Sequence, residues 1–364
     1  MSTIELGCIC RYRTESMLVG SLPYVTTESM LPNKSGIAGK ASAPSSKKAR
    51  LFRNGDTLIS NIRPYFKKIW QAEYDGCCSA DVLVFEPSNC DADYLYWLLS
   101  NDVFFSYMVS TAKGTKMPRG DKSAIMHYAL EHMDVSEQRA IAGVLNPIRE
   151  LIATNQHTND YLAAICDAAF SEQFGNTDDN AVLSDIADIT MGQSPSGKSY
   201  NEEGKGAVFY QGRGEFGWRF PTQRLFTTEP KRMAAAGDVL MSVRAPVGDL
   251  NVAYEDCCIG RGLAAIHSQY PSFCLYLLRS LSRRLNAYNS EGTVFGSING
   301  KTLKALKIAL PDKKSIESFE AKADSIDVQI KINEVESRNL IMLRDALLPK
   351  LMTGEIDPLG GCLA

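Results

Sequence analysis

One stretch decides the fold: VSEQRAIAGVLNPIRELIATNQHTNDYLAAICDAAFSEQFG, residues 135–175. Apolar or small residues recur in it at alternating spacings of three and four, which is the pattern of a heptad seam on a helix. The seam positions are Ile141, Val144, Ile148, Leu151, Thr158, Leu162, Ile165 and Ala169, with Asn155 in the remaining slot. The stretch therefore predicts a long helix.

The expected helix begins near Ser136 and stops at Gly175. We expect a break at Asn146-Pro147, after which Asn146 serves as the N-cap and Pro147 occupies the first turn, where a missing N–H is tolerated. From Pro147 onward the helix would be about 39 Å long at 1.5 Å per residue.

A second seam lies near the C-terminus, at Phe319, Ala323, Ile326, Ile330, Asn333, Ser337, Leu340, Leu343 and Leu347. Asn333 follows Asn155 by 178 positions, and a polar residue in such a seam tends to fix register and partner choice. We expect the packing of the two helices to rest on Ile141, Ile148, Asn155, Leu162, Ile326, Ile330, Asn333 and Leu340. Antiparallel packing would relate the two halves of the chain by a pseudo-twofold axis.

The rest of the chain also repeats. Residue pairs recur in order, 180 to 182 positions apart: Gly55-Asp56 with Gly237-Asp238, Ser60 with Ser242, Arg63 with Arg244, Pro64 with Pro246, and Cys77-Cys78 with Cys257-Cys258. A recurrence of this kind indicates an internal duplication. The expected fold class is α/β, with mixed α+β globular domains in tandem duplication that are separated by the two long helices.

The expected boundaries follow from these patterns and from the polar linker after Gly175. They are a first globular domain (1–134), a central helix (135–175), a linker (176–182), a second globular domain (183–314), a C-terminal helix (315–356) and a tail (357–364).

Composition excludes some classes. Hydrophobic residues make up 45% of the chain, which is typical of a globular protein, and the net charge of −3 favours neither a nucleic-acid nor a membrane partner. Charge is unevenly distributed, however, because residues 34–68 carry nine basic residues and one acid. The ten cysteines include no C-x-x-C pair, and no leader or membrane-spanning run is present, so we expect reduced thiols in a cytoplasmic protein without a membrane partner.

Two motifs resemble nucleotide sites. Residues 192–199, GQSPSGKS, match the Walker A pattern, but the polar, glycine-broken segment after them does not predict the helix that a P-loop requires. Residues 212–217, GRGEFG, match G-x-G-x-x-G, yet Trp218 to Pro221 do not predict a helix either. No catalytic or metal-ligating pattern is evident, so we expect a chain that is not an enzyme. A P-loop nucleotide-dependent enzyme and a coiled-coil protein scaffold are the alternatives.

Several segments together carry a resemblance to a known family. They are Gly192-Gln193-Ser194-Pro195, Phe209-Tyr210-Gln211-Gly212, the run from Gly237 to Gly248, and Ser136-Glu137-Gln138 at the start of a long helix. This combination, in a duplicated chain with two helices, resembles the specificity (S) subunit of Type I restriction-modification systems. The resemblance covers nearly the whole chain.

The resemblance implies two target-recognition domains that each bind one half of a bipartite double-stranded DNA site. It also implies an antiparallel coiled coil that sets the spacer and docks two methyltransferase (M) subunits, with restriction (R) subunits joining them. S-adenosylmethionine, ATP and Mg would belong to those partners, and this chain would hold no cofactor or metal. One departure is that the second helix is preceded by PDKKSIE, residues 311–317, instead of the Glu-Gln signature.

For DNA contacts we expect basic residues in loops that contain glycine or proline. In the first half these are Arg63, Lys67, Lys113, Lys116, Arg119 and Lys122, and in the second half Arg213, Arg219, Arg244 and Lys301. Arginine and lysine can read guanine edges or hold phosphates, and both roles stay open for these residues. Arg63 and Arg244 occupy repeated positions, so a structural role is equally open for them.

Overall fold

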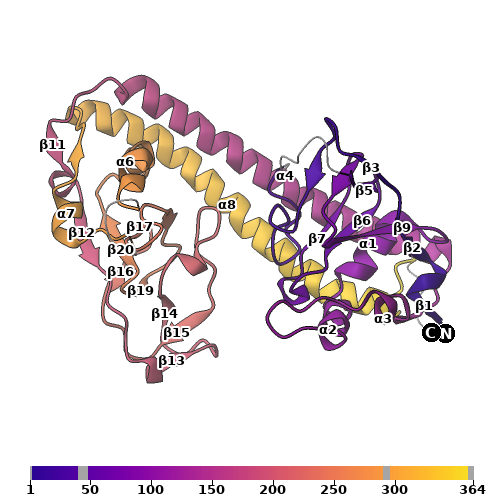
Figure 1. Cartoon of the computed structure of the whole chain (residues 1–364). Helices are drawn as coiled ribbons and strands as arrows, with labels where there is room; N and C mark the ends of the chain where they lie inside the picture. The colour runs from indigo at the N-terminus through magenta and orange to yellow at the C-terminus, as the bar shows by residue number, and fades with distance from the viewer. Residues whose placement is uncertain (1, 40–47, 290–295, 360–364) are drawn as a thin grey trace. The chain divides into compact units, whose positions relative to one another are not determined.

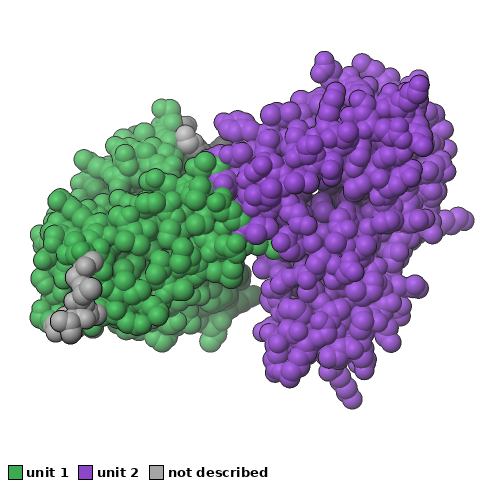
Figure 2. All heavy atoms as spheres, turned by 180° about the vertical axis from the view of Figure 1, so that it is seen from behind, with its two compact units in different colours: residues 1–154, 336–364 green, residues 155–335 purple. Residues whose placement is uncertain are grey.

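A computed structural model describes residues 2–39, 48–289 and 296–359 of the chain. The chain forms two compact units, which Figure 2 shows in different colours. Unit 1 consists of residues 1–154 and 336–364, and unit 2 of residues 155–335. Each unit therefore includes part of both long helices. The expected boundaries instead placed each helix outside the globular domains.

The described residues of unit 1 form two four-stranded sheets and a two-stranded sheet. The first, antiparallel throughout, has the order β2 (Cys10–Tyr12), β9 (Val82–Pro87), β6 (Thr57–Ser60), β7 (Ile69–Gln71). The second has the order β3 (Ser16–Leu18), β5 (Lys48–Phe52), β8 (Gly76–Cys78), β4 (Tyr24–Val25), with β4 and β8 parallel. Unit 1 also contains β1 (Thr3–Glu5) paired with β10 (Ala129–Glu131), and the short helices α1 (Ala92–Ser100), α2 (Asp102–Ser110) and α3 (Lys122–Met126).

In the described ranges, unit 2 repeats the pairing order of the first sheet, whereas its second sheet has five strands instead of four. Its antiparallel sheet is β12 (Asp188–Met191), β20 (Leu263–His267), β17 (Val239–Ser242), β18 (Leu250–Val252). Its second sheet is β13 (Tyr200–Asn201), β15 (Leu225–Thr227), β14 (Ala207–Tyr210), β19 (Cys257–Ile259), β16 (Met233–Ala234), with β14 and β19 parallel. The others are β11 (Ala181–Val182) paired with β21 (Lys307–Ile308), and helices α5 (Pro271–Ser280), α6 (Ser282–Ala287) and α7 (Gly300–Lys304).

A central strand buried on both faces joins two cores in each unit. In β17, Val239 and Met241 face the core beneath α5, whereas Leu240 faces the core against the second sheet. In β6, Ile59 and Leu58 divide in the same way between the two cores of unit 1. Side chains alternate across a strand, so a continuous apolar run such as VLM supplies both cores at once.

The repeated Gly-Asp pair forms the tight turn that leads into each central strand. Gly55 and Gly237 have φ values of +88° and +91°, which a side chain would disfavour. The carboxylate of Asp56 accepts a hydrogen bond from the Arg53 backbone N–H at 2.8 Å, and Asp238 accepts one from Ala235 at the same distance. This part of the repeat is therefore explained by local structure.

Helix α4 (Val135–Phe174) is continuous, so the expected break at Asn146-Pro147 is wrong. The Asn146 side chain does not cap a new helix, because it accepts from the Trp97 indole N–H and donates to Asp93, both at 2.8 Å. Arg149, on the other side of the proline, donates to Gln71 at 2.7 Å and lies over the Tyr96 ring. These contacts hold the helix against unit 1 across the hydrogen bond that Pro147 cannot make.

The helix begins with a capping box. The Asp134 carboxylate accepts from the backbone N–H groups of Ser136 and Glu137, and the Glu137 carboxylate accepts from Asp134 N–H at 2.8 Å. Gln138 accepts from the backbone N–H of Asp91 at the start of α1. The acidic and amide groups of the Ser-Glu-Gln segment thus fix both the helix start and its contact with α1.

Helix α8 (Lys313–Met352) also contacts the start of a short helix, although its sequence differs there from that of α4. Glu320 accepts from the backbone N–H groups of Ser272 and Phe273 at 3.2 and 2.7 Å, at the start of α5. Burial raises the pKa of this carboxyl group, and the two N–H donors oppose that shift. Glu320 therefore contacts α5 as Gln138 contacts α1, although the residues before α8 lack the Glu-Gln signature.

The contacts between α4 and α8 run antiparallel within each unit (Figure 1, magenta and yellow). In unit 1, Ile141 and Leu145 share a core with Leu348 and Leu351. In unit 2, the Phe170 and Phe319 rings meet with centroids 5.4 Å apart. Asn333 of α8 donates to Asn159 of α4 at 2.8 Å.

The expected seam matches the buried stripe only in part. Ile141, Ile148, Asn155, Ile330 and Asn333 are buried, and Leu162, Ile326 and Leu340 are half-buried. By contrast, Val144, Leu151, Ile165 and Leu343 are exposed. The other buried positions of α4 include Ala142, Leu145, Asn159, Ala163, Cys166, Phe170 and Phe174. From residue 141 to residue 166 the least exposed positions of α4 still alternate by four and three, so the heptad is kept and one of its two seam positions lies one residue later than expected. These positions are Ile141, Leu145, Ile148, Ile152, Asn155, Asn159, Leu162 and Cys166.

We predict that Asp56→Ala destabilises unit 1. The Asp56 carboxylate also accepts from Arg13 Nε at 2.7 Å, and both side chains are buried. Its removal leaves a buried guanidinium without its main partner, which typically costs about 3 kcal/mol or more. Urea denaturation followed by circular dichroism measures the loss. Glu15→Ala is the control, because this exposed partner of Arg13 should contribute at most about 1 kcal/mol. Equal losses would contradict the assignment.

Candidate nucleic-acid interface

In unit 1 a turn and a distant loop form one surface at the end of the central strand. After β6 the chain makes the 3-10 turn η2 (Pro64–Phe66) before it enters β7. The Arg63 backbone N–H donates to Pro118 O at 2.8 Å, and Gly120 N–H donates to Asn61 O at 3.2 Å. The structure thus brings Arg63 beside the loop that carries Lys113, Lys116 and Arg119.

This turn holds two side chains in an unusual backbone conformation. Arg63 and Lys67, on either side of η2, both have φ of 50°, in the left-handed region that non-glycine residues rarely adopt. Within the part of the chain that the structure describes, the buried Nε of Arg63 has no acceptor. Backbone strain of this kind is concentrated at functional sites.

Three exposed apolar side chains lie on the same turn and loop. Tyr65 is 49% exposed and Phe66 39%, with ring centroids 4.7 Å apart, and Met117 of the loop is 43% exposed. Nucleic-acid interfaces use such groups to stack on bases or to insert between base steps. The sequence-based site omitted them, although the segment Arg63-Pro-Tyr-Phe-Lys67 already places two aromatic residues between cations.

The basic side chains of this surface are largely paired within unit 1. Lys113 pairs with Asp121, Arg119 with Asp81 at 3.1 Å, and Lys67 with Asp102 at 3.0 Å. Exposed ion pairs contribute at most about 1 kcal/mol, so these cations can exchange a carboxylate for a phosphate at little cost.

Hydrogen bonds from these cations lower the pKa values of their carboxylate partners. The pKa of Asp121 is lowered mainly by the hydrogen bond from Lys113. Burial alone would raise the pKa of Asp102, but hydrogen bonds from Lys34 and Lys67 lower it. Lys116 and Lys122 are exposed, and neither has an ion-pair partner among the described residues.

Unit 2 has the corresponding arrangement after β17. The Ala245 N–H donates to Gly296 O at 2.9 Å, Ile298 N–H donates to Val243 O at 3.1 Å, and Arg244 lies opposite Ser297. Arg244 is exposed, as a DNA contact would require. Residues 290–295, which precede this segment, lie outside the described residues.

Arg219 is not available for DNA, which corrects the sequence-based assignment. It is only 4% exposed, and its guanidinium donates to Asp327 of α8 at 3.2 Å and to the Tyr276 hydroxyl at 3.4 Å. Its role is to join the loop before β15 to the long helix. This ion pair could not be predicted from the sequence, because Asp327 is 108 positions away from Arg219.

The two remaining assignments in unit 2 are surface residues. Arg213 is half-exposed and pairs with Asp249 at 2.9 Å. Lys301 is exposed on α7, in the wall of a hollow that also includes Lys304 and Arg232.

The Walker A match does not form a phosphate cradle. Residues 197–199 make a short 3-10 turn that leads into β13, with no α-helix after it. The Gly192 and Gln193 N–H groups donate to Leu263 O and Ile259 O, and the Ser199 hydroxyl is buried against Thr227 at 2.7 Å. These donors are therefore already used within the sheet. The G-x-G-x-x-G match likewise contains a 3-10 turn, at 213–215, and the next element along the chain is strand β15 and not an α-helix.

The described residues contain neither a candidate metal site nor a candidate membrane-spanning helix. In residues 2–39, 48–289 and 296–359, no group of three or more His, Cys, Asp or Glu side chains could hold a metal ion. No helix in those ranges is long and apolar enough to cross a membrane.

The sequence matches the model of a known family. Residues 179–336 match the family described as Type I restriction modification DNA specificity domain. A Methanocaldococcus jannaschii protein, assigned as the MjaX specificity subunit of a type I restriction enzyme, is 38% identical over 46% of this chain and 40% of its own length. The MjaVIII specificity subunit of the same organism is 23% identical over 93% of this chain and 87% of that protein. The chain thus spans less than half the length of the first of these relatives.

The fold also has a solved counterpart. The S subunit of a Type I restriction-modification system from M. genitalium covers 96% of both chains with a TM-score of 0.57 and 17% sequence identity. At this identity the likeness concerns the fold.

We predict that Arg219 and Arg213 differ in their effect on stability. Arg219→Ala leaves the half-buried Asp327 carboxylate without its cation and should lower the free energy of unfolding by about 3 kcal/mol. Arg213→Ala removes an exposed pair and should change it by less than about 1 kcal/mol. Chemical denaturation of both variants tests this. A stable Arg219→Ala variant would argue against the buried ion pair.

Proposed function

Because the chain belongs to the family of Type I restriction-modification specificity subunits, we propose that it recognises a bipartite DNA site on behalf of catalytic partner subunits. One half of the site would be bound by each unit. The observation that carries this proposal is the recurrence of the turn-and-loop surface beside Arg63 in unit 1 and beside Arg244 in unit 2.

The side chains of these surfaces suit duplex DNA. In unit 1 the exposed Lys116 and the exchangeable Lys113 and Arg119 can hold phosphates, while Tyr65 and Phe66 can contact bases or sugars. With a net charge of −3, the chain as a whole offers little non-specific attraction to DNA. Partner subunits would therefore supply a share of the phosphate contacts.

We propose that α4 and α8 form an antiparallel coiled coil between tandem recognition domains. The antiparallel contacts within each unit and the hydrogen bond between Asn159 and Asn333 support it. Each helix has 40 residues, about 60 Å at 1.5 Å per residue, which is enough to set the spacing between two half-sites. The units would recognise the bases, and the helices would set the length of the spacer.

The helices also offer surfaces for protein partners. In unit 2, Tyr161 and Ile165 of α4 are 73% and 56% exposed, and Val328 and Ile332 of α8 are half-exposed. Apolar side chains gathered on solvent-exposed helices are typical of binding surfaces. We assign them to docking of two methyltransferase subunits, with restriction subunits joining the assembly.

Chemistry would then belong to the partners. S-adenosylmethionine would be held by the methyltransferase subunits, and ATP and Mg would be used by the restriction subunits. The contribution of this chain is to position a chosen DNA sequence for them. Two alternatives are a P-loop nucleotide-dependent enzyme and a coiled-coil scaffold. The engaged N–H groups of Gly192 and Gln193 disfavour the enzyme, and the paired loop surfaces disfavour the scaffold.

We predict that Arg63→Ala weakens binding of the half-site read by unit 1. Loss of one positively charged DNA contact should cost about 1–3 kcal/mol, or roughly tenfold or more in Kd. The target is first found by methylome sequencing of a host that carries this gene and its partners. Fluorescence anisotropy of the assembled complex on that duplex then measures binding.

Arg53→Ala is the matched control. This exposed arginine lies before β6, at the opposite end of the strand from Arg63, and pairs with Glu15. It should leave Kd unchanged. If both variants bind like the wild type, or if no bipartite motif is methylated, the assignment of the turn-and-loop surface to DNA is wrong.

We further predict that shortening both helices shortens the spacer. Deleting residues 150–156 of α4 and 334–340 of α8 removes two turns from each helix, about 10 Å or three base pairs. The methylated motif should keep both half-sites and lose about three base pairs between them. Replacing the exposed His157 and Glu336 by alanine without deletion is the length-preserving control. An unchanged spacer would exclude the role of the helices as a ruler.

A further inference from the structure

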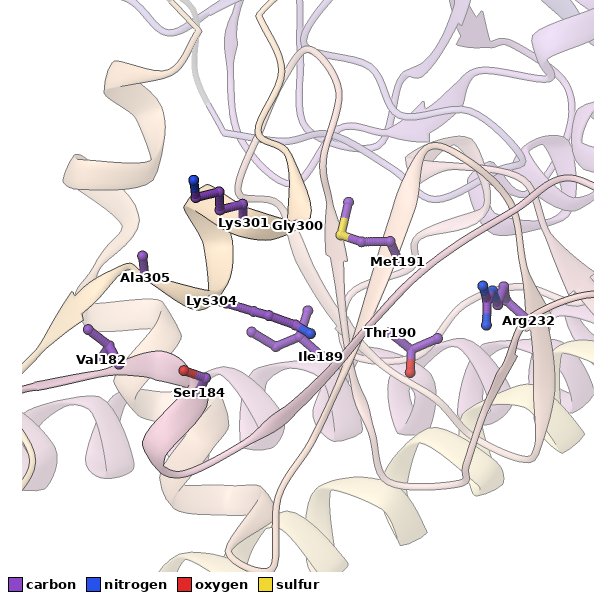
Figure 3. A pocket seen from close by; sticks show the side chains of 10 residues that line it. All are labelled: Val182, Ser184, Ile189, Thr190, Met191, Arg232, Gly300, Lys301, Lys304 and Ala305. Carbon is purple, nitrogen blue, oxygen red and sulfur yellow. The ribbon is translucent and has the colours of Figure 1, made fainter.

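A positively charged hollow of about 680 Å³ lies in unit 2 and includes helix α7, which follows the loop beside Arg244 along the chain. Strand β12 forms one wall, and helix α7 forms another (Figure 3). We call it the cationic hollow, after Arg232, Lys301 and Lys304. Its other lining residues are Val182, Ser184, Ile189, Thr190, Met191, Gly300 and Ala305.

The three cations are spread along the hollow. In Figure 3 the Lys304 side chain runs toward Ile189, Lys301 stands on the same helix, and Arg232 lies beyond Thr190. None of the ten lining residues is acidic, and none of the three cations has an ion-pair partner within the described ranges. The nearby Asp185 carboxylate is engaged, because it accepts from Val182 N–H at 2.9 Å. The hollow therefore presents net positive charge and the hydroxyls of Ser184 and Thr190.

A glycine brings the two walls close together. A Cβ atom on Gly300 would lie 2.9 Å from Met191 Cγ, so a side chain there would force either the Met191 side chain or α7 to move. Leu303 of the same helix is fully buried in the core of unit 2. The helix is thus anchored by Leu303, while Lys301 and Lys304 remain exposed.

Unit 1 provides an internal comparison. Its helix α3 is capped by Asp121 as α7 is capped by Asn299, and its buried Ile125 takes the place of Leu303. Counted from these caps, Ser123 stands where unit 2 has Lys301, and Met126 where it has Lys304. The Tyr12 hydroxyl of β2 donates to the carbonyl of Lys122, the first residue of α3.

The lysines of α7 are not needed for the helix to form. The same helix forms in unit 1 with neutral residues at both lysine positions and an acidic cap, so the fold does not require the cations. The two lysines and the arginine around the hollow carry like charges that repel one another. An anion bound between them would offset this repulsion. A row of cations fits a chain of phosphates better than a single ion.

We propose that the cationic hollow binds consecutive phosphate groups. Lys301, Lys304 and Arg232 would neutralise them, and the Ser184 and Thr190 hydroxyls would donate hydrogen bonds. The phosphates can belong to the backbone of duplex DNA or to a free polyphosphate such as a nucleotide. The DNA source rests on the proposed function of the chain, whereas the free-phosphate source does not.

The test variant is Lys301→Ser/Lys304→Met, which gives α7 the residues that unit 1 carries and should therefore fold. The charge-matched control is Lys307→Ser/Lys313→Ser, which removes two exposed lysines of unit 2 that do not line the hollow. Circular dichroism and thermal unfolding of both variants check that the fold is retained.

The first measurement is calorimetric titration of the full chain with sodium tripolyphosphate at low salt. If the source is free phosphate, the wild type and the control bind, and the test variant loses at least tenfold in affinity. Adding Arg232→Ala to the test variant should weaken binding further. This arm needs neither DNA nor partner subunits, so it stands even if the proposed function fails.

The second measurement is DNA binding by the assembled complex between about 50 and 200 mM salt. If the source is the DNA backbone, the test variant binds every sequence more weakly. The magnitude of its slope of log K against log salt also decreases by roughly two, because each lost phosphate contact contributes about 0.9. The control should keep the wild-type slope. If the test variant matches the control in both measurements, the hollow is not a phosphate site.

Discussion

The structure depends on the burial of one stripe of each long helix. A helix of 40 residues presents many side chains to water, and tertiary packing supplies most of the stability of helices in proteins. In unit 2 the Phe170, Phe174 and Phe319 rings interlock with Phe273 of α5, and in unit 1 Ile141 and Leu145 enter the core beneath α1. Without this packing, the sheets of each unit would lack one wall of their core.

Polar contacts fix how each long helix is placed against its own unit. Asn146 and Arg149 contact Trp97, Asp93 and Gln71 in unit 1, while Asp327 contacts Arg219, Tyr276 and Ser272 in unit 2. Buried polar groups that satisfy one another in this way permit few alternative arrangements. Each network joins a long helix to a strand or loop of its own unit. The surface loops are thereby held relative to the helix that would dock a partner.

The sequence predicted the elements better than the roles of their charges. Both long helices and the repeated positions are visible in the heptad and duplication patterns, because these patterns are local or ordered along the chain. The break at Pro147 was wrong, since contacts from α1 and β7 hold the helix across it. Arg219 was misassigned for a related reason: its partner Asp327 is distant in sequence, and only folding brings the two together. The exposed Tyr65 and Phe66 were missed because aromatic residues are more often part of a core.

The sequence by itself determined the two helices, the repeat and the turns at Gly55-Asp56 and Gly237-Asp238, because periodicity and turn chemistry are properties of neighbouring residues. Tertiary structure alone decided which face of each helix is buried. It also decided which cations are exposed, as it hides Arg219 and leaves Arg244, Lys301 and Lys304 at the surface. Burial is set by what packs on a residue, and most of those partners lie far away along the chain.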